Sequence, residues 1–166
     1  MDKQAALDKL ANDILRDAAL DEIAPREQKR SPIDHWSPAV LLERAAYLRK
    51  MAKFGNGSAS EVIREYPQHT VMLCFCGRTG EAEMQRNSAQ LIHVLAGSAT
   101  LVTGGTLTGS RQVEPGETRG VSIEGGMRQE LRAGEVVHVP AGIAHQMLVT
   151  GDRSITWLTV KIWEIL

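Results

Sequence analysis

The segment at residues 134–145 (GEVVHVPAGIAH) has residue types and spacing that could place a histidine for chemistry. Gly134 makes a turn into an apolar strand, and Pro140 and Gly142 then bend the chain sharply. The bend aims His145 inward from the start of the following strand. A histidine held by such a rigid turn is well placed to bind a ligand or to carry a proton near neutral pH.

This segment resembles the second sequence motif of the cupin superfamily, G-x5-P-x-G-x2-H-x3-N. Every motif position is matched except the last, where Val149 stands in place of asparagine. The resemblance covers about residues 60–163. Within the superfamily the segment resembles small single-domain bacterial cupins, and this comparison implies no particular reaction. It implies a mainly β fold, a double-stranded β-helix or jelly-roll barrel, with His145 in its interior.

The first cupin motif, G-x5-H-x-H-x4-E-x6-G, is matched in spacing but not in residue type. Gly77 and Gly97 enclose three polar residues at the motif spacing, namely Glu83, Gln85 and Gln90. The family has His, His and Glu at these positions. The resemblance therefore implies that these three side chains face the motif-2 histidine inside the barrel. Residues two apart on a strand share a face, so Glu83 and Gln85 can both point inward.

The altered residues weaken the metal site that the resemblance would otherwise imply. Metal-binding cupins typically hold iron, manganese, nickel, copper or zinc with three histidines and one carboxylate. Here Glu83 and His145 are the strong donors, because the amides of Gln85 and Gln90 carry no charge. We expect the four residues to hold a divalent ion (Fe, Mn, Ni or Zn) weakly or not at all, and the cofactor stays open.

Three functions are compatible with this set of residues. The leading hypothesis is a pocket for a sugar, a polyol or a small organic acid, in which His145 and Glu83 act as an acid–base pair and Gln85 and Gln90 bind the ligand. The alternative is a metal-dependent oxygenase or isomerase that uses the same four positions. The third is a ligand sensor without catalysis, and the fold alone does not choose among them.

Other residues are weaker candidates for the site. His138, on the strand leading into the motif, is either a further ligand-binding residue or a hydrogen-bonded structural histidine. His93 lies at an odd offset from Gln90, so we expect it to face away from the pocket. Cys74 and Cys76 are expected to be free thiols on one strand face, because so close a pair bridges poorly. A solvated face, or anion binding at the barrel rim, is expected for the arginines between the motifs: Arg111, Arg119, Arg128 and Arg132.

The chain changes character near residue 57. Apolar residues recur at helical spacing over residues 7–18, which predicts an amphipathic helix. After a charged, proline-containing linker, Ser37 as N-cap and Pro38 at the first helical position predict a second helix, ended by residues 55–57. We therefore expect an N-terminal helical extension over residues 1–57 and a cupin β-barrel over residues 58–166. The extension would cover the barrel or a dimer seam, and a lid is an alternative role.

Short β runs separated by turn residues fill the chain after residue 57, with no βαβ pattern. Gly104–Gly105 and Gly125–Gly126 are expected to form tight hairpin turns, because glycine adopts positive φ without steric cost. The predicted runs are 59–66, 69–76, 82–86, 90–95, 98–103, 106–109, 119–123, 127–132, 135–139, 144–149 and 154–163.

Composition limits the classes of partner. The net charge is −1 with no basic block, so we expect no nucleic-acid partner. No apolar stretch approaches the ~20 residues that cross a bilayer, so we expect no membrane span. Charged residues recur throughout the first twenty positions, whereas the core of a secretory signal is apolar. We therefore expect a cytoplasmic protein. Trp157 and Trp163 share one face of the last run, which favours burial against a second sheet or a homodimer partner.

Overall fold

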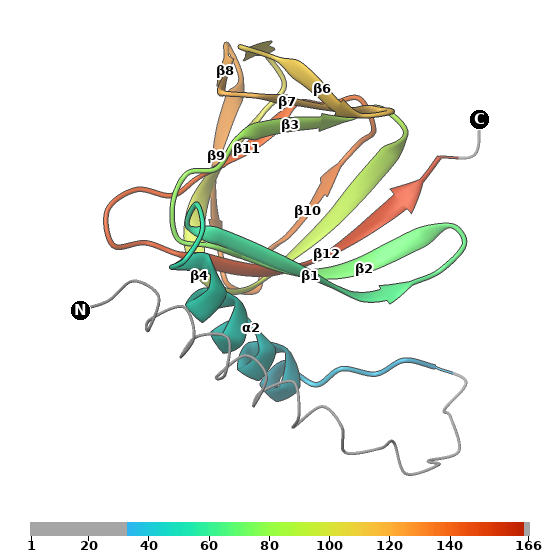
Figure 1. Ribbon diagram of the computed structural model, residues 1–166, viewed down its shortest axis with the longest axis vertical. Helices are drawn as coiled ribbons and strands as arrows, with labels where there is room; N and C mark the ends of the chain where they lie inside the picture. Colours follow the sequence, from blue (N-terminus) through green and yellow to red (C-terminus); the bar gives the residue numbers. More distant parts are fainter. Residues whose placement is uncertain (1–32, 165–166) are drawn as a thin grey trace, which may run out of the picture. The chain divides into compact units, whose positions relative to one another are not determined.

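The computed structural model describes residues 33–164, in which helix α2 (Pro38–Ala52) precedes a series of antiparallel strands (Figure 1). The predicted helix at residues 7–18 lies outside the described residues. The strands in chain order are β1 (Ser58–Glu65), β2 (His69–Cys76), β3 (Ala82–Gln85), β4 (Ser88–Thr103), β5 (Thr106–Thr108), β6 (Arg111–Glu114), β7 (Glu117–Gly120), β8 (Ser122–Glu124), β9 (Met127–Arg132), β10 (Val136–Val139), β11 (His145–Leu148) and β12 (Ile155–Trp163).

Ten of these strands form one curled sheet, and β5 and β8 form a separate pair. The path through the large sheet is β1-β2-β12-β4-β11-β3-β7-β6, and β9 and β10 also pair with β4. In Figure 1, β1, β2 and β12 lie in one wall, and β3, β7 and β11 lie in the opposite wall. The long strand β4 joins the walls, because its first half pairs with β12 and its second half pairs with β11.

Strand β4 is continuous where the sequence predicted two runs separated by Gly97. Gly97 has φ of +76°, and the register with β12 shifts beside it, so the strand bends there instead of ending. A Cβ atom at Gly97 would lie 1.9 Å from the carbonyl oxygen of Ser154. Glycine is therefore required at this bend for two reasons, the positive φ and the close approach of the neighbouring backbone.

The prediction of hairpin turns at the two Gly-Gly pairs is wrong. Gly104–Gly105 connects β4 to β5 and Gly125–Gly126 connects β8 to β9, but neither pair of strands is hydrogen-bonded to each other. The two connections instead pack together, since a Cβ at Gly105 would lie 2.7 Å from the backbone nitrogen of Gly126. Glycine is used here so that the chain can pass from the large sheet into the β5–β8 pair and back.

Helix α2 begins as predicted and ends slightly earlier. The Ser37 hydroxyl accepts a hydrogen bond from the backbone N–H of Val40 at 3.4 Å, and Pro38 occupies the first turn. The helix ends at Ala52, and residues 53–57 form the turn that leads into β1. The side chains that the helix buries lie three or four residues apart: Leu41, Ala45, Leu48 and Ala52.

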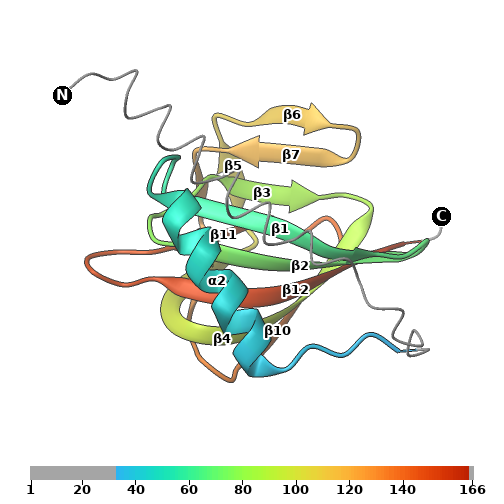
Figure 2. The ribbon, with the colours of Figure 1, turned by 60° about the horizontal axis from the view of Figure 1, so that its bottom comes forward.

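Two apolar clusters hold the described part of the chain together. One lies between α2 and the outer face of β2, where Leu48 and Ala52 pack against Leu73 and Phe75 (Figure 2). The other fills one end of the barrel interior, with members from five strands or strand ends: Cys76, Val94, Ala99, Leu101, Leu131, Val149 and Ile155. The compact unit that begins at Trp36 contains α2 as well as the strands.

No helix within residues 33–164 is long and apolar enough to cross a membrane.

Candidate functional site

Three neighbouring strands place an imidazole, a carboxylate and a guanidinium side by side. Glu83 on β3 stands opposite His145 on β11 and opposite Arg119 on β7. Directly opposed residues of antiparallel strands share a face of the sheet, so the three side chains form one row. The register of the sheet therefore brings together residues that lie 62 positions apart in the chain.

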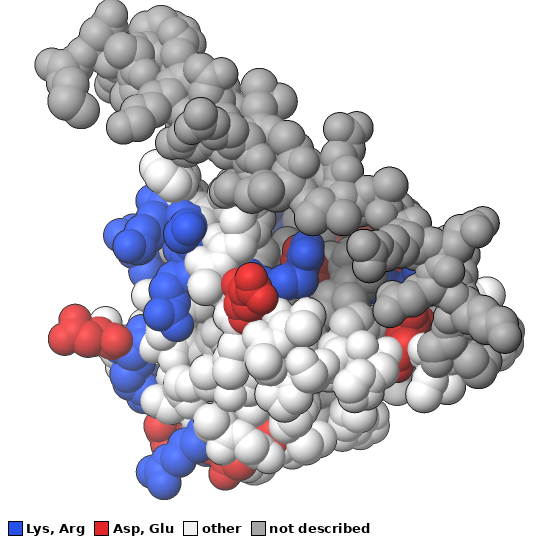
Figure 3. All heavy atoms as spheres, turned by 90° about the horizontal axis from the view of Figure 1, so that it is seen from below, with Lys and Arg blue, Asp and Glu red and all other residues white. Residues whose placement is uncertain are grey.

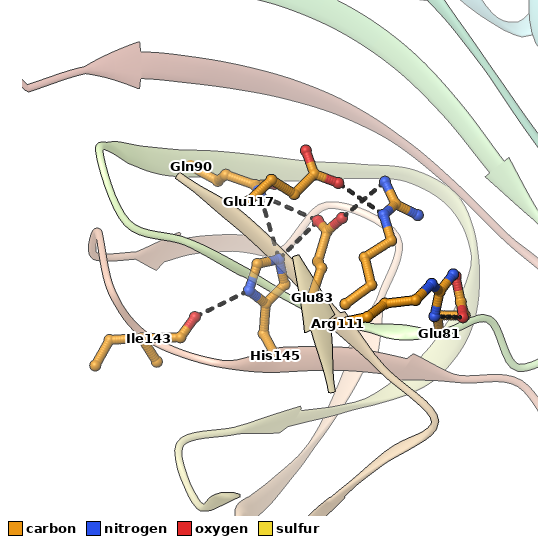
Figure 4. Close-up of polar contacts among 8 residues, drawn as sticks. Glu81, Glu83, Gln90, Arg111, Glu117, Ile143 and His145 are labelled. Atoms are coloured by element: carbon orange, nitrogen blue, oxygen red, sulfur yellow. Dashed lines mark hydrogen bonds and ion pairs between the residues drawn. The ribbon is translucent and has the colours of Figure 1, made fainter. Parts of the chain in front are cut away.

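The carboxylate of Glu83 is the centre of this row (Figure 4). Its Oε1 lies 3.0 Å from His145 Nε2, and its Oε2 lies 3.6 Å from a terminal guanidinium nitrogen of Arg119. The Gln90 amide nitrogen donates to the same Oε1 at 3.2 Å. Gln90 comes from β4 and is 4% exposed, so it reaches the pair from another part of the barrel wall. The site is thus a buried network around one carboxylate.

The two ring nitrogens of His145 contact different partners. Nδ1 lies 3.2 Å from the carbonyl oxygen of Ile143, which can only accept a hydrogen bond. Nε2 faces the Glu83 carboxylate, which also only accepts when ionised. Nε2 also lies 3.2 Å from the Gln90 amide nitrogen, so it donates to Glu83 when it carries a proton and can accept from Gln90 when it does not.

The surroundings of Glu83 keep it ionised. Burial by itself would raise its pKa, but the hydrogen bond from His145 and the charges of His145 and Lys161 outweigh burial, and Gln90 adds a further hydrogen bond. The result is a pKa lowered to about 2. Glu83 is therefore ionised and accepts hydrogen bonds throughout the physiological pH range, and its side chain keeps 24% exposure.

The network opens into a cavity of about 370 Å³ inside the barrel. That volume is in the range of small-molecule sites in proteins. The polar side chains that line it include Glu83, Gln90, Arg119, His145, Thr159 and Lys161. Its apolar lining comes from the opposite wall and from β4 and β11: Met72, Ile92, Leu101, Met147 and Trp157. The cavity can therefore hold a molecule with both an apolar body and polar groups.

The structure separates the predicted site residues. Glu83, Gln90 and His145 come together as predicted, whereas Gln85 is 7% exposed, is not among the cavity-lining residues, and has no hydrogen-bond partner for its Nε2 in the described part of the chain. Its backbone oxygen accepts from the Gly142 N–H at 2.7 Å. Gln85 thus anchors the turn before His145 through its main chain.

Two further strand histidines, His138 and His93, lie outside the cavity. His138 is exposed and stands opposite the exposed Leu91, so it faces outward. The expectation that it binds the ligand in the pocket is therefore wrong. The strand alternation explains this, because its neighbour Val139 is the residue that points inward. His93 is also exposed and faces away from the cavity, as expected.

Sequence reasoning did not place two cationic residues, Arg119 and Lys161, in the cavity. Arg119 was expected on a solvated face or, as the alternative, at the barrel rim as an anion-binding residue. Its place beside Glu83 depends on the pairing of β3 with β7, which no local pattern reveals. The other three arginines of that group are exposed. Lys161 could have been found, because it falls on the same alternating face as Trp157 and Thr159 in an otherwise apolar strand.

The cysteines and the last-strand tryptophans also face the barrel interior. Cys74 and Cys76 are buried free thiols, and burial together with the Glu83 charge raises the pKa of Cys74 to about 12. Trp157 lines the cavity, and Trp163 lies further along the same strand with 44% exposure. Trp157 is therefore accounted for by the inside of the barrel, and the homodimer stays a prediction.

The donor set does not fit a firmly held metal ion. Within residues 33–164 there is no group of three or more His, Cys, Asp or Glu side chains that could hold a metal ion. At the positions that hold metal in cupins, the strong donors of this chain are one imidazole and one carboxylate, and these two contact each other. Such a pair would hold a first-row ion weakly unless a bound ligand supplied the remaining donors.

A second hollow lies on the face that carries α2, where Lys and Arg side chains gather along one side (Figure 3). It has a volume of about 320 Å³ and is lined by Arg49, Lys53, Arg78 and Arg153 together with Asp152. Arg49 lies over the Phe75 ring at 5.5 Å, and Arg153 pairs with Glu130 at 2.7 Å. Two of its cations are therefore already engaged.

Solved structures share this fold at low sequence identity. An uncharacterized conserved protein with a double-stranded β-helix domain from Klebsiella pneumoniae aligns at 17% identity and a TM-score of 0.52, over 80% of this chain and 90% of that protein. A cupin superfamily protein from Desulfitobacterium hafniense aligns at 14% identity and a TM-score of 0.46, over 66% and 81% of the two chains. The polyketide cyclase RemF from Streptomyces resistomycificus aligns at 14% identity and a TM-score of 0.47 over 64% of this chain, which spans 65% of the cyclase's length.

No protein-family model matches the chain, and no curated protein matches it in sequence. The structural likeness concerns the fold alone, and it agrees with the curled antiparallel sheet and with the interior position of both motif segments. The prediction of a mainly β barrel with an N-terminal helix is confirmed: the chain has a double-stranded β-helix, the fold that the cupin resemblance implied.

Proposed function

We propose that the chain binds a small polar organic molecule inside its cupin barrel, and that His145 and Glu83 act toward this molecule as proton donor and proton acceptor. The observation that carries the proposal is the contact of 3.0 Å between His145 Nε2 and Glu83 Oε1 at the wall of a cavity of about 370 Å³. An imidazolium beside a carboxylate can give a proton to one ligand atom and accept one from another.

Neighbouring groups hold both side chains of this pair in place. Ile143 fixes the far side of the His145 ring, and Gln90 and Arg119 hold the Glu83 carboxylate. Preorganised side chains of this kind lose little freedom when a ligand binds. A ligand that reaches Glu83 therefore meets a charged network in a fixed orientation, which supports a binding site and, if the ligand carries an exchangeable proton, acid–base chemistry.

The test is a thermal-shift screen of the full-length protein against sugars, polyols and small organic acids. A compound that binds the native state and not the unfolded state raises the melting temperature, and the rise grows with the ratio of its concentration to its dissociation constant. His145→Asn is expected to remove the shift, whereas His138→Asn is expected to keep it, because His138 faces outward. A shift that survives His145→Asn would contradict the proposal.

Two further measurements separate the alternatives. Metal analysis of the purified protein is expected to give well under one iron, manganese, nickel or zinc per chain; a stoichiometric ion that disappears in His145→Ala would favour a metal-dependent oxygenase or isomerase instead. Turnover of the stabilising compound that is lost in Glu83→Gln would identify an enzyme. Binding without turnover would identify a ligand sensor.

A further inference from the structure

Lys161 brings a positive charge to the cavity without an ion-pair partner. It stands directly opposite Gln90 in the register of β12 and β4, and it lines the same cavity as the His145–Glu83 pair. No ion pair or hydrogen bond of its ammonium group is found within the described part of the chain. Its charge nevertheless acts on Glu83, so the two groups face the same space beyond ion-pair distance.

The other charges at the cavity are matched by neighbours. Glu83 is held by His145 and Arg119, and Arg119 also pairs with Glu117 at 2.7 Å. Glu81, a further lining residue, pairs with Arg111 at 2.7 Å. Cys74 lies near Lys161 but stays a neutral thiol, because burial raises its pKa. The ammonium of Lys161 is therefore the charge of the cavity wall that a ligand could best neutralise.

Thr159 supplies an independent sign that something binds there. It lies two residues before Lys161 on the same strand face and lines the cavity. Its side chain is 2% exposed, and its Oγ1 has no hydrogen-bond partner in the described residues. A buried hydroxyl without a partner costs free energy of folding, so a ligand atom that accepts its proton is favoured at this position.

We propose that Lys161 and Thr159 form an anion subsite, and that the ligand of the barrel is a small hydroxy- or oxo-carboxylate with an apolar body. This inference rests on the proposed function and narrows its substrate class. The carboxylate would accept hydrogen bonds from the Lys161 ammonium and the Thr159 hydroxyl. The hydroxyl or oxo group would lie toward His145 and Glu83, and the apolar body would pack on Met72, Ile92 and Trp157.

The test compares carboxylates with their own uncharged amides by titration calorimetry on the full-length protein. The probes are a set of hydroxy- and oxo-acids that includes mandelate with mandelamide and lactate with lactamide, and sugars and polyols are titrated alongside. We expect the acids to bind roughly tenfold to hundredfold more tightly than their amides, as for hydrogen bonds to a charged group. Lys161→Met is expected to abolish this preference.

Two variants show whether the effect belongs to the subsite. Lys50→Met removes a lysine from the exposed face of α2 and is expected to keep the preference for acids. Thr159→Val replaces the unpartnered hydroxyl by a methyl group, so it is expected to weaken acid binding while leaving the unliganded protein as stable as before or more so. Thr159→Val also keeps the test decisive if Lys161→Met fails to fold.

The outcomes separate the subsite from the proposed function. If acids and amides bind equally, or if neutral sugars or polyols bind and Lys161→Met leaves their affinity unchanged, the anion subsite is wrong and the binding pocket stands. If no compound of either charge binds, both proposals are overturned.

Discussion

His145 and Glu83 stand opposite each other in the register of β11 and β3, and their side chains meet at 3.0 Å between Nε2 and Oε1. The two residues come from the two glycine-punctuated segments that carry the cupin resemblance. Their contact therefore depends on the whole barrel being closed in the correct register, and the ion pair contributes to stability as well as to the site.

The free energy of unfolding of variants at this pair should be non-additive. His145→Asn leaves a largely buried carboxylate without its closest cation, and we expect a loss of about 1–3 kcal/mol. Glu83→Gln should cost less, because a neutral amide can still accept from the imidazole. The double variant should cost less than the sum of the single ones by about 1 kcal/mol or more. Urea unfolding measures all four proteins, and additive losses would contradict the ion pair.

Stability should fall with acid in a window set by Glu83. Its folded pKa of about 2 lies below the usual glutamate value, so the native state binds this proton less readily than the unfolded state. The contribution is therefore complete above a pH of about 4.5 and is lost as the pH falls toward about 2, with an upper limit of about 3 kcal/mol. The difference in unfolding free energy between wild type and Glu83→Gln should shrink across this window. A difference that is constant from pH 6 to pH 2.5 would contradict the ion pair.

The site residues could be predicted from the sequence where glycine and proline fix the backbone geometry around them. Pro140 and Gly142 define the turn before His145, and the glycine spacing of the first motif leads to Glu83 and Gln90. Alternation along a strand also placed His93 on the outside. Alternation does not show whether an inward side chain reaches the cavity. Gln85 lies on the same side of β3 as Glu83, yet it is buried away from the cavity.

The parts that escaped sequence analysis depend on pairing between distant strands. Arg119 reaches the site because β7 pairs with β3, and Lys161 stands beside Gln90 because β12 pairs with β4. The Gly-Gly pairs have the local signature of hairpins, but their strands pair elsewhere, so the connections serve a different purpose. Strand β6 (Arg111–Glu114), exposed throughout, has no alternation to reveal it.

Cys74 should be unreactive in the native protein although it lies beside the cavity. The thiolate is the reactive species, and a pKa of about 12 leaves almost none of it at pH 8. Iodoacetamide should therefore modify Cys74 only at the rate of unfolding, and both cysteines should react quickly in urea. Mass spectrometry of tryptic peptides over time measures this, and fast labelling of Cys74 in the native protein would show that the thiol is accessible and ionised.

Gly97 should be one of the positions least tolerant of a methyl group, and Gly104 provides a matched control. The two glycines have nearly the same φ, +76° and +73°, so alanine carries a similar backbone cost of about 1–2 kcal/mol at both. At Gly104 nothing lies within 4 Å of the added Cβ, whereas at Gly97 the Ser154 carbonyl oxygen lies at 1.9 Å. Gly97→Ala must therefore push β4 away from the segment that leads into β12, next to the bend that joins the two walls. We expect a loss of more than about 3 kcal/mol for Gly97→Ala and about 1–2 kcal/mol for Gly104→Ala, measured by urea unfolding. Equal losses would mean that the positive φ alone, and not the close approach of Ser154, requires glycine at residue 97.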